Sequence, residues 1–103
     1  MMDEWQQRVA AFAQHHGLLH DPATHALDLV SEVGEVAKEI LRATSYGDRP
    51  LQSSAELNDE IGDALYSLLA LAESCGVDAG ASLDAALGKY ERRLGQRDTA
   101  GSQ

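Results

Sequence analysis

Four acidic side chains with matched spacing are the feature of this sequence that points most directly to chemistry. Glu32 and Glu35 form one pair, and Glu60 and Asp63 form a second pair with the same separation. Residues three apart lie on one side of a helix, so two neighbouring helices would direct all four carboxylates into one small volume. Carboxylates this close repel one another, and a hard divalent cation such as Mg²⁺ is the usual compensation. The spacing therefore predicts a metal site, and such a site favours phosphate chemistry.

Acidic stripes on helices also have a simpler interpretation as solvated surface. The net charge is −9, which makes some clustering of acids expected by chance. Two matched pairs that both border an apolar stripe favour a metal site over solvated surface.

Two other protein classes are alternatives to a metal-dependent enzyme of phosphate chemistry. A di-iron carboxylate bundle would need Glu-x-x-His, which the sequence lacks. A non-catalytic acidic helical interaction module would bind a basic partner and show no metal dependence.

Composition excludes several other classes of protein. The 103 residues suit one domain, and the prominence of Ala and Leu favours helices. The 17 acids against 8 Lys and Arg argue against a surface for nucleic acid polymers or anionic membranes. No apolar run is long enough to span a membrane, and no secretory signal is visible. The single cysteine, Cys75, excludes an internal disulfide. We therefore expect a cytoplasmic protein.

Four amphipathic helices are expected to position the acids. Each has recognisable start or stop residues, such as an N-cap before the helix or a glycine after it. The expected helices run from Asp3 to His16, from Pro22 (capped by Asp21) to about Ser45, from the capping-box sequence Ser53-Ser54-Ala55-Glu56 to a stop at Gly76, and onward from a cap at Asp78. We expect residues 1–96 to form one helical domain and residues 97–103 a polar C-terminal tail.

The apolar stripes predict how these helices pack. Short loops favour an all-α, antiparallel bundle of about four helices, with two long central helices. The second helix has a predicted buried face formed by Leu29, Val30, Val33, Val36, Ala37, Ile40 and Leu41. Cys75 falls on the apolar stripe of the third helix and is expected to be an unreactive residue of the hydrophobic core. A chain this short buries a modest core, so we expect a homo-oligomer.

The acid pairs and their surroundings resemble a known family. The segment Leu29-Val-Ser-Glu32-Val-Gly-Glu35 is followed by Glu60-Ile-Gly-Asp63-Ala-Leu-Tyr-Ser-Leu-Leu. This order of E-x-x-E, a loop and E-x-x-D is similar to that of the MazG-like all-α nucleoside triphosphate pyrophosphohydrolases, over roughly Trp5 to Leu94. The resemblance implies hydrolysis of a nucleoside triphosphate to a monophosphate and pyrophosphate, with Mg²⁺ as cofactor and Mn²⁺ as an alternative. It further implies a homodimer or homotetramer.

Carried over by position, the resemblance makes Glu32, Glu35, Glu60 and Asp63 the catalytic Mg²⁺ ligands. Many relatives have a second Glu directly before the first ligand, where this sequence has Ser31. A hydroxyl is a poor general base near neutral pH, so either the metal activates the water unaided or a ligand carboxylate relays its proton.

Cations and aromatic residues outside the acid pairs are candidates for substrate contacts. Lys89 and Arg93 lie one turn apart on the fourth helix and are expected to bind substrate phosphate. Lys38, one turn beyond Glu35, is expected to pair with a neighbouring acid instead. Trp5 and Tyr66 are able to stack on a nucleotide base. The alternative for Trp5 is to anchor its helix, and the alternative for Tyr66 is to lie in an oligomer interface.

Overall fold

The computed structural model describes the backbone of residues 4–101 and the side chains of residues 4–96. It contains α1 (Glu4–His15), α2 (Pro22–Ala43), α3 (Ala55–Cys75) and α4 (Ala79–Gly101). The prediction of an all-α fold with two long central helices is confirmed, and the described residues contain no strand. Residues 1–3 of the predicted domain and 102–103 of the predicted tail lie outside the described residues. None of the described helices is both long enough and apolar enough to cross a membrane.

The residues that begin and end the helices are largely those expected. Ser54, rather than Ser53, is the N-cap of α3, and its hydroxyl accepts a hydrogen bond from the Leu57 N–H at 3.0 Å. Gly76 ends α3 in the left-handed conformation, at a φ of 68°, where glycine has no steric penalty. Asp78 accepts a hydrogen bond from the Ala81 N–H at 3.0 Å. Asp21 holds the N-cap position of α2 but bonds the Thr24 hydroxyl instead of a backbone N–H.

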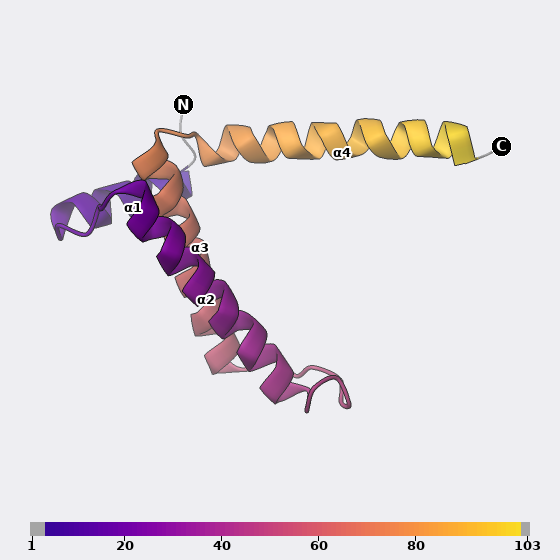
Figure 1. Cartoon of the computed structure of the whole chain (residues 1–103), viewed down its shortest axis with the longest axis horizontal. Coiled ribbons are helices and arrows are strands. Elements are labelled where there is room, and N and C mark those ends of the chain that lie inside the picture. The colour runs from indigo at the N-terminus through magenta and orange to yellow at the C-terminus, as the bar shows by residue number, and fades with distance from the viewer. Residues whose placement is uncertain (1–3, 102–103) are drawn as a thin grey trace.

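Three of the helices pack together, and the fourth lies apart. α2 packs along α3, α1 packs on α3, and α4 makes no comparable contact with any of them. Figure 1 shows α4 running away from the α2–α3 pair. Within one chain, α4 therefore does not complete the expected bundle. It also continues as helix to Gly101, into the range predicted as a tail.

A buried glutamine connects α1 to the turn between α3 and α4. Gln6 is 1% exposed, and its amide nitrogen donates to the Glu73 carboxylate at 3.2 Å and to the Val77 carbonyl at 2.8 Å. Its amide oxygen accepts the Ala79 N–H at 2.7 Å. Because every polar atom of this side chain has a partner, its burial carries no desolvation penalty from an unpaired group. The contacts hold α1 on α3 and fix the start of α4.

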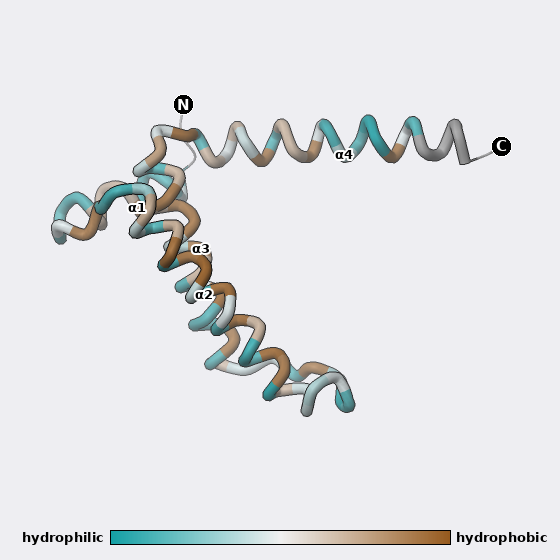
Figure 2. Tube along the Cα trace, viewed as in Figure 1, coloured by the Kyte–Doolittle hydropathy of each residue, from teal (hydrophilic) through white to brown (hydrophobic). Residues whose placement is uncertain are grey.

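The apolar face predicted for α2 is mostly exposed in the single chain, as are several large apolar side chains of α3 and α4. Figure 2 shows hydrophobic positions recurring along these helices. Val30 is 70% exposed and Val33 is 52% exposed, because α4 does not pack over α2 within the single chain. The buried apolar side chains are few and mostly small: Ala10, Ala13, Leu57, Leu69, Ala70 and Ala72. The expectation that Cys75 is core is wrong, since this residue is exposed.

Candidate metal centre

Three of the four predicted metal ligands meet where α2 packs against α3. One carboxylate oxygen from each of Glu32, Glu60 and Asp63 can be chosen so that all three lie within 4.8 Å of one another. Glu32 and Glu60 are half-buried at the helix contact, and Asp63 is exposed beside them. The i, i+3 spacing places Glu60 and Asp63 on neighbouring turns of α3, and the α2–α3 packing supplies Glu32. The two helices thus bring the acids together as their spacing predicts.

Glu60 is the carboxylate most affected by this arrangement. Burial raises its pKa above the ordinary value, and the negative charges of Glu35, Asp63 and Glu32 raise it further. Both effects disfavour the ionised carboxylate. The protein has therefore placed an acid where its charge is unfavourable unless a cation compensates it.

This raised pKa predicts a specific pH dependence for the metal-free protein. A group whose pKa is higher in the folded state stabilises the fold at low pH, and this contribution is lost as the pH rises through its folded pKa. In the presence of EDTA, we expect Glu60→Gln to raise the melting temperature at pH 7. The gain should vanish as the pH falls below about 4, where an unfolded glutamate is also protonated. Thermal unfolding of both proteins between pH 3.5 and 8 measures this, and an equal gain at every pH would contradict it.

Glu35, the fourth predicted ligand, lies beside the three-acid cluster instead of within it. It lines a pocket of about 270 Å³ together with Lys38, Glu39, Arg42 and Glu60. Glu60 therefore belongs both to the cluster and to this pocket, which we call the mixed-charge pocket. Ser31, which directly precedes Glu32, is exposed.

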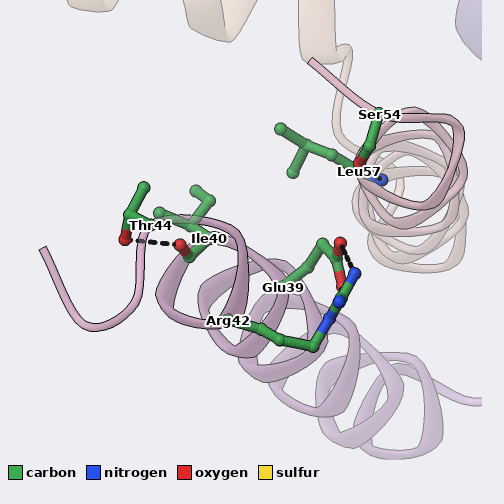
Figure 3. Close-up of polar contacts among 6 residues, drawn as sticks. All are labelled: Glu39, Ile40, Arg42, Thr44, Ser54 and Leu57. Carbon is green, nitrogen blue, oxygen red and sulfur yellow. Dashed lines mark hydrogen bonds and ion pairs between the residues drawn. The ribbon is translucent and has the colours of Figure 1, made fainter. Parts of the chain in front are cut away.

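The mixed-charge pocket contains an ion pair that sequence reasoning missed. The Nε and Nη2 atoms of Arg42 donate to the two carboxylate oxygens of Glu39, which is 9% exposed (Figure 3). These hydrogen bonds lower the pKa of Glu39. The expectation that Lys38 pairs with an acid is wrong, because among the described residues Arg42–Glu39 is the ion pair and Lys38 forms none. The signal available in the sequence was the i, i+3 spacing of Glu39 and Arg42.

The predicted phosphate-binding cations of α4 do not approach the acids of their own chain. At a rise of about 1.5 Å per residue, Lys89 and Arg93 lie roughly 15 and 21 Å along α4 from its start. Glu60 lies about 22 Å along α3 from the C-terminal end of that helix, which is on the other side of the turn between α3 and α4. Since α4 runs away from the α2–α3 pair (Figure 1), these cations lie far from the acids of their own chain. The Lys89 ammonium instead lies 5.4 Å from the centre of the Tyr90 ring.

Trp5 and Tyr66 line one pocket between α1 and α3, of about 500 Å³, together with Phe12. The Phe12 and Tyr66 rings meet edge to face at 6.0 Å. The Tyr66 hydroxyl is buried without a hydrogen-bond partner. None of the three clustered acids lines this pocket, so the aromatic pocket is distinct from the acid cluster, although Tyr66 follows Asp63 by one turn of α3.

The residues of the cluster fit a hard divalent cation. Three carboxylates offer oxygen ligands, which Mg²⁺ and Mn²⁺ prefer, and no histidine or cysteine joins them. The same clustering makes the negative charge on Glu60 unfavourable, and a bound cation would stabilise that charge. Exposed Asp63 leaves one side open to solvent, as a catalytic site needs for its substrate and water.

Comparison with known proteins agrees with this geometry. Residues 20–98 match the family described as the MazG nucleotide pyrophosphohydrolase domain, so the match contains both acid pairs, Lys89 and Arg93. Among curated proteins, no match is found.

Two solved structures share the fold. The first is the Bacillus-conserved MazG protein, a nucleotide pyrophosphohydrolase. It is 23% identical, with a TM-score of 0.70 over 87% of this chain and 88% of that one. The second is the Bacillus subtilis YPJD protein, described as a pyrophosphatase candidate. It is 26% identical, with a TM-score of 0.70 over 87% of this chain and 92% of the other. The arrangement of α1 to α4 is therefore one that solved relatives also adopt.

Proposed function

Because the chain belongs to the MazG nucleotide pyrophosphohydrolase family, we propose that it hydrolyses nucleoside triphosphates to nucleoside monophosphates and pyrophosphate, with Mg²⁺ as cofactor. The family makes it a hydrolase that acts on pyrophosphate bonds. The proposal adds the Mg²⁺ dependence, with Mn²⁺ as a substitute, and a role in maintaining the nucleotide pool. The convergence of Glu32, Glu60 and Asp63 is the observation that carries it.

The reaction exchanges one bond at phosphorus for another. The oxygen of a water molecule attacks the α-phosphorus, and the bond to the oxygen bridging the α- and β-phosphates breaks. Pyrophosphate leaves with the bonding electrons, and the water loses one proton. When bound, Mg²⁺ supplies charge neutralisation and a more acidic water at the α-phosphate.

The side chains of this site have distinct proposed tasks in that reaction. Glu32, Glu60 and Asp63 hold the cation, and Glu35 completes the set from the adjoining pocket. Because Ser31 is no general base near neutral pH, a ligand carboxylate is the available group to receive the proton of the water.

Self-association is part of the proposal. The exposed apolar side chains of α2, α3 and α4 support a homodimer or homotetramer, since such stripes are unfavourable in water. Lys89 and Arg93 would then bind substrate phosphate at the site of another copy, because α4 does not reach the acids of its own chain. A cytoplasmic location is also proposed, because the family acts on nucleotides.

The direct test is pyrophosphate release from a panel of ribo-, deoxyribo- and modified nucleoside triphosphates, with Mg²⁺ and with EDTA. We expect release from at least one triphosphate, and only with the metal. An acidic interaction module, the alternative function, would release none and would show no thermal shift with Mg²⁺.

A further inference from the structure

A pocket with two cations adjoins the three clustered acids. Glu60 belongs to both, so a ligand held at the acids has the mixed-charge pocket directly beside it. Lys38 and Arg42 are one turn apart on α2, and both line this pocket. They are therefore cations of the same chain in a pocket that shares Glu60 with the cluster, whereas those of α4 lie far away.

Arg42 is held in a fixed position with donors to spare. Its two hydrogen bonds to Glu39 use the Nε edge of the guanidinium group. Three of its five N–H groups remain, and they include the outer edge formed by Nη1 and Nη2. That edge has the geometry that binds two phosphate oxygens at once. Since the Arg42 side chain is 63% exposed, a ligand has access to it.

Lys38 is a cation without an ion-pair partner in an acidic protein. Several carboxylates lie near it, yet among the side chains described it forms no ion pair. With Glu39 paired with Arg42, and with a divalent cation compensating Glu35 and Glu60, the positive charge of Lys38 is left without a carboxylate to balance it in the pocket. An anion is the ligand that such a pocket favours.

The pocket also has room for the leaving group. Its volume of about 270 Å³ is enough for a small anion of the size of pyrophosphate.

We propose that the mixed-charge pocket binds the β- and γ-phosphates of the substrate, and then pyrophosphate, through Lys38 and the outer edge of Arg42. This assignment rests on the proposed function. It makes Lys38 a binding residue contributed by the same chain that contributes the acids. It also gives the Glu39–Arg42 ion pair a task, which is to orient the guanidinium group toward the phosphates.

Lys38→Gln is the decisive variant, because Lys38 is exposed and has no ion pair whose loss would disturb the fold. Titration calorimetry with pyrophosphate in excess Mg²⁺ measures the affinity, and steady-state kinetics give KM and kcat for the best triphosphate. We expect pyrophosphate binding to weaken about tenfold or more, with a similar rise in KM, because a charge-assisted hydrogen bond is lost. Lys38→Arg should restore most of the affinity, and the thermal shift caused by Mg²⁺ alone should not change.

Arg49→Gln is the matched control, since it removes the same charge from an exposed loop position outside the pocket. The double variant Glu39→Gln/Arg42→Gln removes the ion pair without leaving a buried charge alone, and should weaken pyrophosphate binding as well. If wild type releases pyrophosphate but Lys38→Gln behaves like Arg49→Gln, the pocket assignment is overturned and the proposed function stands. If wild type neither releases nor binds pyrophosphate with Mg²⁺, both are overturned.

Discussion

Glu60→Gln and Asp63→Asn are each expected to lower Mg²⁺-dependent pyrophosphate release by about 100-fold or more. Each change removes one negatively charged oxygen ligand from a set of three that lies within 4.8 Å. An amide in place of the carboxylate keeps the shape but binds a hard cation weakly. Disturbing even an outer-shell partner of a metal site costs about 10–100-fold, so loss of a ligand should cost at least that.

Thermal unfolding separates this effect from misfolding. Wild type should be stabilised by Mg²⁺, and stabilised further by a non-hydrolysable triphosphate analogue, whereas both variants should lose these shifts while keeping their helicity. Asp59→Asn is the matched control, because Asp59 is an exposed acid on α3 outside the cluster. Turnover by either site variant at the wild-type rate would remove that residue from the proposed ligand set.

Val33→Asp is expected to abolish self-association. Val33 is 52% exposed in the middle of α2, in a stripe that continues through Val30 and Leu41. An interface that buries this stripe would have to bury the new carboxylate, at a cost of several kcal/mol. A cost of about 3 kcal/mol per interface weakens the assembly more than 100-fold. Sedimentation velocity at micromolar concentration measures the change.

The control for that experiment is Leu51→Asp. Leu51 is 46% exposed, but it lies in the loop before α3 and not on the helix stripes. It should leave the assembly intact. A monomeric wild-type protein, or a Val33→Asp variant that sediments with wild type, would show that a second copy does not cover this stripe.

Local features of the fold were predictable because they depend on neighbouring residues. The cap at Asp78 and the stop at Gly76 follow from side chains and backbone conformations within one turn. The convergence of Glu32, Glu60 and Asp63 was also accessible, because helical periodicity and antiparallel packing of consecutive helices are enough to generate it.

Features that depend on competition between partners were not predictable. Lys38 and Arg42 both have acids within one turn, and the sequence does not reveal that Arg42 takes Glu39 while Lys38 takes none. The direction of α4 was inaccessible for a related reason. The apolar stripe of α4 indicates that this helix needs a packing partner, but it does not specify whether the partner is in the same chain. The prediction that Cys75 is buried assumed packing within one chain, so its exposure was missed too.

The proposed hydrolysis requires a cation held between α2 and α3, and anomalous diffraction from a crystal soaked in Mn²⁺ tests for this cation most directly. We predict a manganese peak within bonding distance of oxygens from Glu32, Glu60 and Asp63 of the same chain, which is absent in crystals of Glu60→Gln. A fully soaked crystal with no peak at these carboxylates, or with manganese bound only elsewhere, would contradict the metal centre and the chemistry proposed for it.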